Sequence, residues 1–231
     1  MAAAGSAANR AGPSATRRSR VGGAATHGRG SDSGFSDWSV PLEYDHAMMG
    51  ASVEREWKLD GTATSQWPAE VYRVLKAAQV KQMAYVPDAG HTALINLFAA
   101  DREVNSTVLT TEEEGVALAA GAWLGGQRTV LLMQSSGVGN CINMLSLPVI
   151  GRFPLLVLVT MRGEWAEFNP WQVPMSRATQ PALEAIGLKV LRADAAGDLA
   201  DVVEAAAALA YDSDQQVAVL IGQRMIGKKK W

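Results

Sequence analysis

Short apolar runs alternate with longer stretches of helical periodicity from residue 66 to the end of the chain. Runs rich in Val, Ile and Leu and closed by turn residues predict strands, and the longer stretches predict helices. The expected strands span residues 82–86, 106–110, 129–134, 155–160, 189–193 and 217–221. The expected helices span residues 69–78, 92–100, 112–124, about 140–149, 180–186 and 199–211.

This alternation predicts an α/β fold, a doubly wound and mostly parallel sheet in one domain over residues 66–231. Strands that are apolar throughout are buried on both faces, which requires helices on both sides of the sheet. The connections of such a fold are right-handed, and its ligands bind at the carboxyl ends of the strands. Side chains that follow the strands are therefore the first candidates for chemistry.

The segment before residue 66 has a different composition. Residues 1–37 are rich in Ala, Gly, Ser and Arg and show no apolar periodicity, so we expect a disordered extension. An acid-poor, Arg-rich and Ser-rich segment also has the composition of an organellar transit peptide. The alternative is a dispensable extension from an upstream start codon, since Met48 and Met49 precede the domain. We interpret residues 38–65 as a lead-in segment.

Composition and charge exclude several classes of protein. The chain is 48% hydrophobic and 19% charged, and its longest apolar runs are too short to cross a bilayer. Beyond residue 30 it has 16 basic and 23 acidic residues, a poor surface for nucleic acid. One cysteine and three scattered histidines favour a reducing, cytoplasmic location without a structural metal site. We expect neither membrane nor nucleic-acid binding.

Three glutamates, Glu112, Glu113 and Glu114, precede a helix of small residues with the sequence GVALAAGAWL. Thr111 and Glu114 have the spacing of a capping box, which is a purely structural role. Successive helical residues point about 100° apart, so at most one of the three acids can enter a given pocket. Small residues on several faces predict that something large packs closely: another helix, a partner subunit or a flat cofactor.

Three other strand ends carry polar residues. The sequence SSGVGN after the strand 129–134 predicts a glycine-rich turn near a ligand, or a turn that only connects two elements. Asp88 and His91 follow the first strand and could transfer protons, or His91 could be a surface histidine. Arg162 could pair with an anionic group, or it could be a solvated loop residue.

Taken together, TEEEGVALAAGAWLGG, VLLMQSSGVGNCINMLSL, LVTMRGE and QVPM resemble one family. They are similar to the α subunit of sulfopyruvate decarboxylase and to the amino-terminal part of phosphonopyruvate decarboxylase. Both belong to the enzymes that use thiamine diphosphate, and the matching part is their pyrimidine-binding (PYR) domain. The resemblance extends over residues 67–222 and is densest over residues 111–140.

The resemblance implies roles for particular residues. In this superfamily a glutamate nine residues before a helix glycine hydrogen-bonds the pyrimidine nitrogen of the cofactor, and counting back from Gly121 gives Glu112. This assigns the catalytic role to Glu112 and leaves Glu114 as a structural acid. The family's QNSGLGN-like loop, which lies beside the pyrimidine, matches the cofactor-binding candidates Gln134, Ser135, Ser136, Gly137, Gly139 and Asn140. Asp88, His91 and Arg162 remain candidates for the substrate.

The sequence lacks the GDG motif with which related enzymes hold the diphosphate and Mg²⁺; its nearest approach is Gly197-Asp198-Leu199. The resemblance therefore implies a separate β subunit that carries the diphosphate-binding (PP) domain, holds Mg²⁺ and shares the thiamine diphosphate site. The implied function is the PYR-domain subunit of a heteromeric 2-oxoacid decarboxylase that releases CO₂ and an aldehyde. The alternatives are a subunit of a carboligase or lyase that uses the same cofactor, or a non-catalytic α/β regulatory subunit.

Overall fold

The computed structural model describes residues 66–227, so the predictions for residues 1–65 lie outside the described part of the chain. Six strands form one sheet in the order β2-β1-β3-β4-β6-β5, and every neighbouring pair is parallel. The strands are β1 (Val80–Tyr85), β2 (Asn105–Val108), β3 (Arg128–Gln134), β4 (Leu155–Thr160), β5 (Lys189–Ala193) and β6 (Gln216–Ile221). The predicted α/β fold with a parallel sheet is confirmed.

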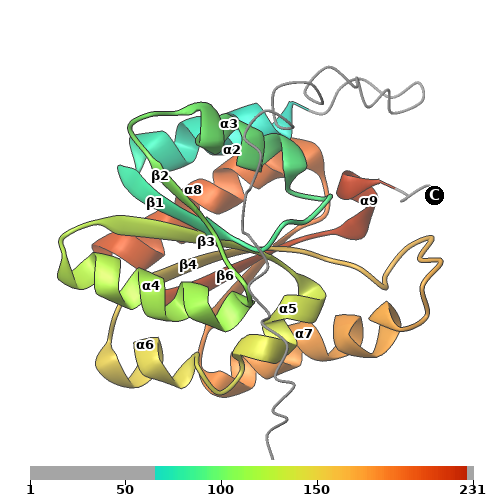
Figure 1. Cartoon of the computed structure of the whole chain (residues 1–231). Helices are drawn as coiled ribbons and strands as arrows, with labels where there is room; N and C mark the ends of the chain where they lie inside the picture. The colour runs from blue at the N-terminus through green and yellow to red at the C-terminus, as the bar shows by residue number, and fades with distance from the viewer. Residues whose placement is uncertain (1–65, 228–231) are drawn as a thin grey trace, which may run out of the picture. The chain divides into compact units, whose positions relative to one another are not determined.

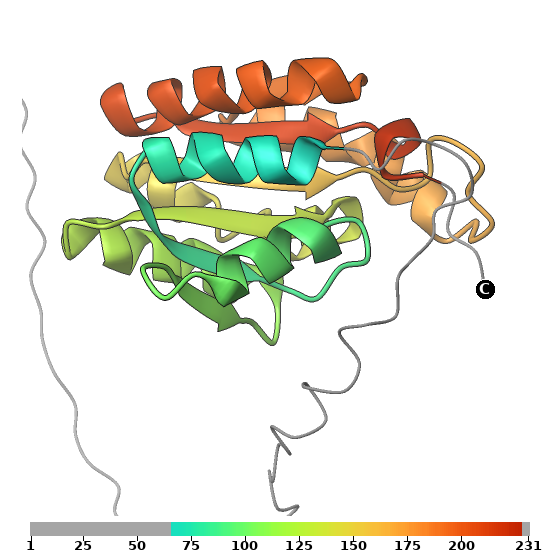
Figure 2. The same ribbon diagram turned by 90° about the horizontal axis from the view of Figure 1, so that it is seen from above.

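Helices cover both faces of this sheet (Figure 1). One apolar layer packs under α2 (Trp67–Ala77), α3 (Thr92–Ala100) and α8 (Ala196–Asp212), which lie in front of the sheet in Figure 2. The second layer packs under α4 (Glu112–Leu124), α5 (Ser135–Cys141), α6 (Ser146–Gly151) and α7 (Gln172–Ile186). The central strand β4 is buried along its whole length because both layers contact it.

The strand order places a reversal of winding between β1 and β3. The chain leaves β1 through α3 toward one edge of the sheet, then returns past β1 through α4 to reach β3. Right-handed connections that run in opposite directions lie on opposite faces, so their starts diverge at the carboxyl ends of β1 and β3. This topological switch point is where such folds bind ligands. In Figure 2 the carboxyl ends of the strands lie toward α9 (Gln223–Ile226).

Two helix predictions need correction. The sequence SSGVGN is not a turn: residues 135–141 form α5, and a second short helix, α6, replaces the rest of the single helix expected over 140–149. The glycines serve close packing, since a Cβ on Gly137 would overlap the Glu112 carboxyl group and one on Gly139 would lie 3.2 Å from Met175 Sδ. Helix α7 begins at Gln172, eight residues before the predicted start at 180, and continues through Pro181.

The described part of the chain ends in the short helix α9, which the sequence pattern did not predict. Among residues 66–227 no helix is long and apolar enough to cross a membrane.

Candidate active site

Glu112 occupies the first position of α4, and its side chain points toward α5 rather than toward solvent. Its residue surface is 8% exposed, whereas Glu113 and Glu114 are exposed. The Oε2 atom of Glu112 accepts a hydrogen bond of 2.9 Å from Asn140 Nδ2 at the end of α5. The predicted separation of the three acids is therefore seen in their burial: one faces inward and two face outward.

The capping box proposed for Thr111 and Glu114 is incomplete. Thr111 is the N-cap residue of α4, but its side chain makes no capping hydrogen bond. The Oε2 atom of Glu114 instead accepts a 2.9 Å hydrogen bond from the backbone N–H of Thr110, one residue before the N-cap. Glu114 therefore binds a backbone N–H group just before the helix, but Thr111 does not make the reciprocal bond of a capping box.

The glycine at position 137 makes the inward position of Glu112 possible. A Cβ built at Gly137 would overlap the Glu112 carboxyl group, so α5 can approach α4 only with a hydrogen atom at this position. Cys141 lies one helical turn further along α5 and is fully buried. Burial, with the nearby charges of Glu112 and Glu113, raises the pKa of this thiol to about 12, so it stays protonated at neutral pH.

A second polar group lies at the switch point between β1 and β3. Gln134 Nε2 donates a 3.1 Å hydrogen bond to Asp88 Oδ1, and Thr160 Oγ1, at the end of β4, donates a 2.6 Å bond to Asp88 Oδ2. The Nδ1 atom of His91 lies 3.5 Å from the same Oδ2 atom. Ser136 Oγ donates to Gln134 Oε1 at 2.9 Å. The structure thus brings Asp88, His91 and Gln134 together.

Asp88 is ionised in this environment, although its side chain is only 7% exposed. Burial alone would raise the pKa of this carboxyl group, but His91, Thr160 and Gln134 stabilise the anion and hold the pKa well below its usual range. His91 is fully buried, and its ring nitrogens have no hydrogen bond of normal geometry within the described residues. It is therefore not the surface histidine that the sequence allowed.

Arg162 follows β4 and is already paired within the chain. Its Nε and Nη2 atoms donate to the two carboxylate oxygens of Glu167 at 2.7 and 2.6 Å. This fork lowers the pKa of Glu167 to about 2. An anionic substrate group could use the fork only if this ion pair opened, so Arg162 is neither free nor solvated as the sequence alone allowed.

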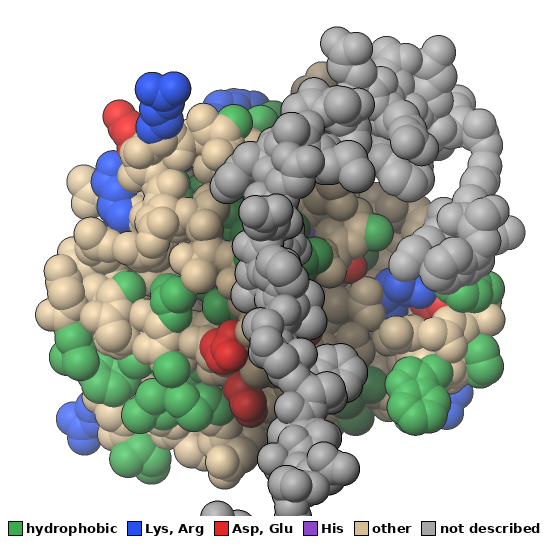
Figure 3. Space-filling model, viewed as in Figure 1, with side chains coloured by type: hydrophobic (Ala, Val, Ile, Leu, Met, Phe, Trp, Pro, Cys, Tyr) green, Lys and Arg blue, Asp and Glu red, His purple; other side chains and the backbone are tan. Residues whose placement is uncertain are grey.

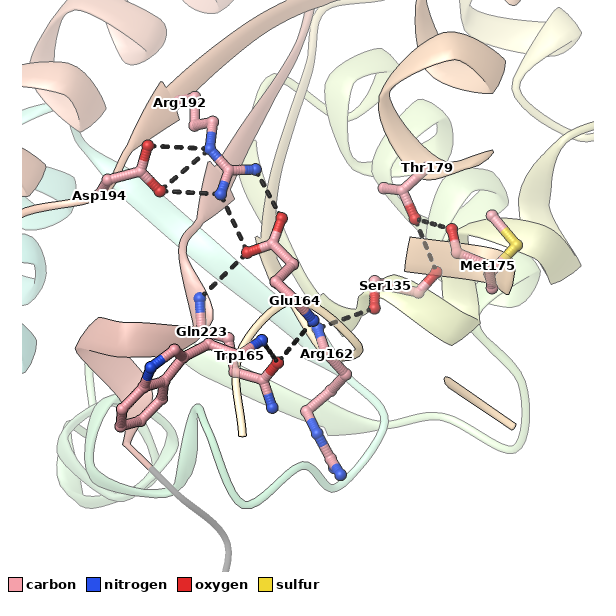
Figure 4. A network of polar contacts seen from close by, with 9 residues as sticks. All are labelled: Ser135, Arg162, Glu164, Trp165, Met175, Thr179, Arg192, Asp194 and Gln223. Carbon is pink, nitrogen blue, oxygen red and sulfur yellow. Dashed lines mark hydrogen bonds and ion pairs between the residues drawn. The ribbon is translucent and has the colours of Figure 1, made fainter. Parts of the chain in front are cut away.

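Figure 4 shows how the segment that contains Arg162 is attached to the sheet. Gln223 in α9 accepts the backbone N–H groups of Glu164 and Trp165 at 2.8 and 2.9 Å. The carboxylate of Glu164 binds Arg192 of β5 through both oxygens. Neither Gln223 nor Arg192 stood out in the sequence, since isolated polar residues carry no spacing pattern.

The same segment also contacts the first residue of α5, directly after β3. The hydroxyl of Ser135 accepts the backbone N–H of Arg162 at 3.1 Å, and the backbone carbonyl of Ser135 accepts the Thr179 hydroxyl at 3.4 Å (Figure 4). Ser135 is fully buried, and these two hydrogen bonds hold the start of α5 in place. Among residues 66–227, no group of three or more His, Cys, Asp or Glu side chains could hold a metal ion.

A larger protein of known structure contains a similar fold. The 2-oxoglutarate:ferredoxin oxidoreductase from Magnetococcus marinus, solved with 2-oxoglutarate, coenzyme A and succinyl-CoA, superimposes with a TM-score of 0.59. The match covers 71% of this chain but 31% of that one, at 15% identity, so it establishes the fold alone. No family model matches the chain.

Curated relatives identify the family. The sulfopyruvate decarboxylase subunit α of Methanococcus maripaludis is 31% identical over 152 residues, which cover 65% of this chain and 91% of the relative. The corresponding subunit of Methanothermobacter thermautotrophicus is 39% identical over 110 residues, covering 47% of this chain and 67% of the relative. The phosphonopyruvate decarboxylase of Streptomyces viridochromogenes is 37% identical over 118 residues, which cover 50% of this chain but 30% of that protein. The chain belongs to the sulfopyruvate decarboxylase α subunit family.

Proposed function

We propose that the chain is the α subunit of a heteromeric decarboxylase that uses thiamine diphosphate to convert a 2-oxoacid into CO₂ and an aldehyde. The names of its relatives support both the reaction and the second subunit. The observation on which the proposal rests is the inward position of Glu112, a carboxylate at the start of a helix with one hydrogen-bond donor among the described residues.

The surroundings of Glu112 fit the pyrimidine ring of this cofactor. A carboxylate can accept a hydrogen bond from a protonated ring nitrogen, and such a pair is stronger in a water-poor cleft than in bulk water. Gly137 leaves room beside the carboxyl group, and Asn140 fixes the orientation of that group through Oε2. When bound, thiamine diphosphate supplies the nucleophile and the electron sink for decarboxylation. Glu112 holds or moves the proton at the ring nitrogen.

The group of Asp88, His91 and Gln134 is our candidate for handling the substrate. It lies at the switch point, and Gln134 is partly exposed there while Asp88 and His91 are buried. An imidazole beside a carboxylate can accept a proton at one ring nitrogen and donate one at the other. We assign no anchoring role to Arg162, because Glu167 occupies its fork. Sulfopyruvate and phosphonopyruvate are the substrate candidates because the relatives carry these names.

We assign Mg²⁺ and the diphosphate group to a β subunit with a PP domain, since the sequence contains no GDG motif. The outer face of α4 supports a partner at this position. Ala117, Gly121 and Leu124 lie on this face, and among the described residues no atom outside the adjoining helix backbone comes within 4 Å of a Cβ built on Gly121. Figure 3 shows apolar side chains gathered over α4 and α6, where Leu124 and Ile150 are 75% and 83% exposed.

The proposal is tested by reconstitution. The full chain is mixed with a candidate β subunit that contains GDG and a later Asn, together with thiamine diphosphate and Mg²⁺. Release of CO₂ is measured with sulfopyruvate, phosphonopyruvate, phenylpyruvate and pyruvate. We expect no activity from either subunit alone. The mixture should release CO₂ from at least one of the four 2-oxoacids. A stable complex that binds the cofactor but releases no CO₂ from any of the four would contradict the decarboxylase proposal and favour a carboligase or a regulatory subunit.

A further inference from the structure

The side-chain amide of Gln134 is held at both ends. Its Nε2 atom donates to Asp88 Oδ1 at 3.1 Å, and its Oε1 atom accepts from Ser136 Oγ at 2.9 Å. An ionised carboxylate only accepts hydrogen bonds, so the end of the amide that faces Asp88 must be the amino group. This group has two N–H bonds, and Asp88 uses one of them. The other is a donor that Gln134 can offer to a ligand.

The negative charge of Asp88 determines the orientation of the Gln134 amide, and the Thr160 hydroxyl stabilises that charge. The Thr160 hydroxyl donates the shortest hydrogen bond to Asp88, 2.6 Å to Oδ2. The packing around this bond is tight, because a Cβ on Gly90 would lie 2.9 Å from Thr160 Cγ2 and 3.0 Å from Asp88 Oδ2. Threonine at the end of β4 therefore touches a carboxylate from the loop after β1, across the strand β3 that carries Gln134.

Protonation of Asp88 would remove the constraint on the orientation of the Gln134 amide. A neutral carboxyl group can donate as well as accept, so the amide of Gln134 could then turn its carbonyl oxygen toward Asp88. Within the described residues, His91 is the one titratable side chain in contact with Asp88; Thr160 and Gln134, on β4 and β3, are uncharged. The Thr160 hydroxyl stabilises the ionised form of Asp88 more than the neutral form, because a hydrogen bond to a charged oxygen is the stronger one.

We infer that Thr160 is a positioning residue: through Asp88 it fixes the Gln134 amide so that a free N–H faces an acceptor oxygen of the bound 2-oxoacid. This inference rests on the proposed function and names the part of the substrate concerned. A donor suits the carboxylate or keto oxygen that every 2-oxoacid has, not the sulfonate or phosphonate tail that distinguishes them. Replacing Thr160 should therefore affect all four 2-oxoacids to a similar degree.

The matched variants are Thr160→Val, which removes the hydroxyl at nearly constant shape, and Thr160→Ser, which keeps it. The first measurement uses the full chain alone: the side-chain amide signal of ¹⁵N-labelled Gln134 is followed by NMR between pH 8 and pH 4.5. The signal is assigned by its loss in Gln134→Glu. Because the pKa of Asp88 lies below this window, the signal of the parent chain and of Thr160→Ser stays constant. In Thr160→Val the Asp88 carboxylate loses its shortest hydrogen bond, so the signal is displaced from its position in the parent chain and in Thr160→Ser.

The second measurement uses the reconstituted enzyme. Loss of a hydrogen bond to a charged group should lower kcat/KM by roughly tenfold in Thr160→Val, for every 2-oxoacid tested. The acid limb of its pH profile should move to higher pH, while Thr160→Ser stays within about threefold of the parent. The side chain introduced by Asp88→Asn cannot ionise. This variant should therefore lower kcat/KM, and its Gln134 amide signal should not change with pH.

Equal losses in Thr160→Ser and Thr160→Val would show a packing role and overturn the inference, as would an unchanged Gln134 signal and pH profile in Thr160→Val. If the unaltered chain shows no decarboxylase activity with its partner, the proposed function fails. The NMR measurement on the isolated chain still decides whether Thr160 controls the amide of Gln134.

Discussion

Two glutamates near the carboxyl edge of the sheet have opposite surroundings. Glu167 accepts five hydrogen bonds from within the chain: two from Arg162, one from Gln223 and two from the backbone N–H groups of Gly163 and Asn169. Among the described residues Glu112 accepts one, from Asn140. A buried carboxylate requires several donors, so Glu167 is satisfied by its own chain while Glu112 has acceptor capacity for another molecule. The contrast separates a structural acid from a candidate catalytic acid better than burial does.

The largest effect should follow Glu112→Gln in the reconstituted enzyme. The amide keeps the shape but cannot serve as the anionic partner of a protonated ring nitrogen, so kcat should fall on the order of 10²- to 10⁴-fold. The matched control is Glu113→Gln on the exposed face of the same turn, which should retain most activity. Steady-state kinetics on both variants test the assignment, and equal tolerance of the two changes would falsify it.

Glu167→Gln should instead damage stability. The change leaves Arg162 without its charged partner in a site where the two side chains are 11% and 3% exposed. Loss of one member of a buried pair costs about 3 kcal/mol in the free energy of unfolding, or roughly 5–10 °C in Tm for a domain of this size. Urea denaturation measures the cost, and the exposed Glu184→Gln serves as a control that should stay within about 0.5 kcal/mol.

The cost of Glu167→Gln should also depend on pH. Arg162 lowers the pKa of Glu167 to about 2 in the folded chain, below its unfolded value of about 4.3. The carboxylate therefore contributes its full stabilisation above about pH 4.3, and the contribution is lost as the pH falls toward 2. The difference between the parent chain and Glu167→Gln should narrow over that range. A difference that stays constant from pH 7 to pH 2.5 would contradict the ion-pair explanation.

Gly137→Ala should move Glu112 without changing its charge. The new methyl group would overlap the carboxyl group, so either Glu112 or α5 must shift, at a cost of about 1–3 kcal/mol. We expect kcat/KM to fall more than tenfold in the reconstituted enzyme. Gly197→Ala in the first turn of α8 is the control, because its Cβ would meet no other described element within 4 Å. Similar activity of the two variants would show that the contact between Gly137 and Glu112 does not matter.

The sequence predicted the sheet well because each buried strand is an unbroken apolar run, as in β4 and β6. It failed for α5, where the glycines suggested a turn and serve close helix packing instead. The position of Glu112 followed from a family spacing, whereas Thr160 and Gln223 could not be recognised. Their partners lie 72 and 56–59 residues away in the chain, and no local pattern reports such contacts. Local periodicity determines the elements, but the polar contacts between their ends depend on the assembled sheet.

Two glycines of α4 are small for different reasons, and replacing the outer one should give the smallest effect of all. Gly115 packs against Leu131 of the chain's own sheet, so its small size has an internal reason, whereas a Cβ on Gly121 would contact no other part of the described residues. Gly121→Ala should therefore stabilise the isolated chain by about 1 kcal/mol, because alanine is the better helix former. If α4 contacts the β subunit through this face, the added methyl should weaken the complex even as it stabilises the monomer. Gly197→Ala in the first turn of α8, where the new Cβ likewise meets no other described element within 4 Å, should leave assembly unchanged. Titration of the β subunit against the three chains measures this, and equal affinity for all of them would remove α4 from the interface.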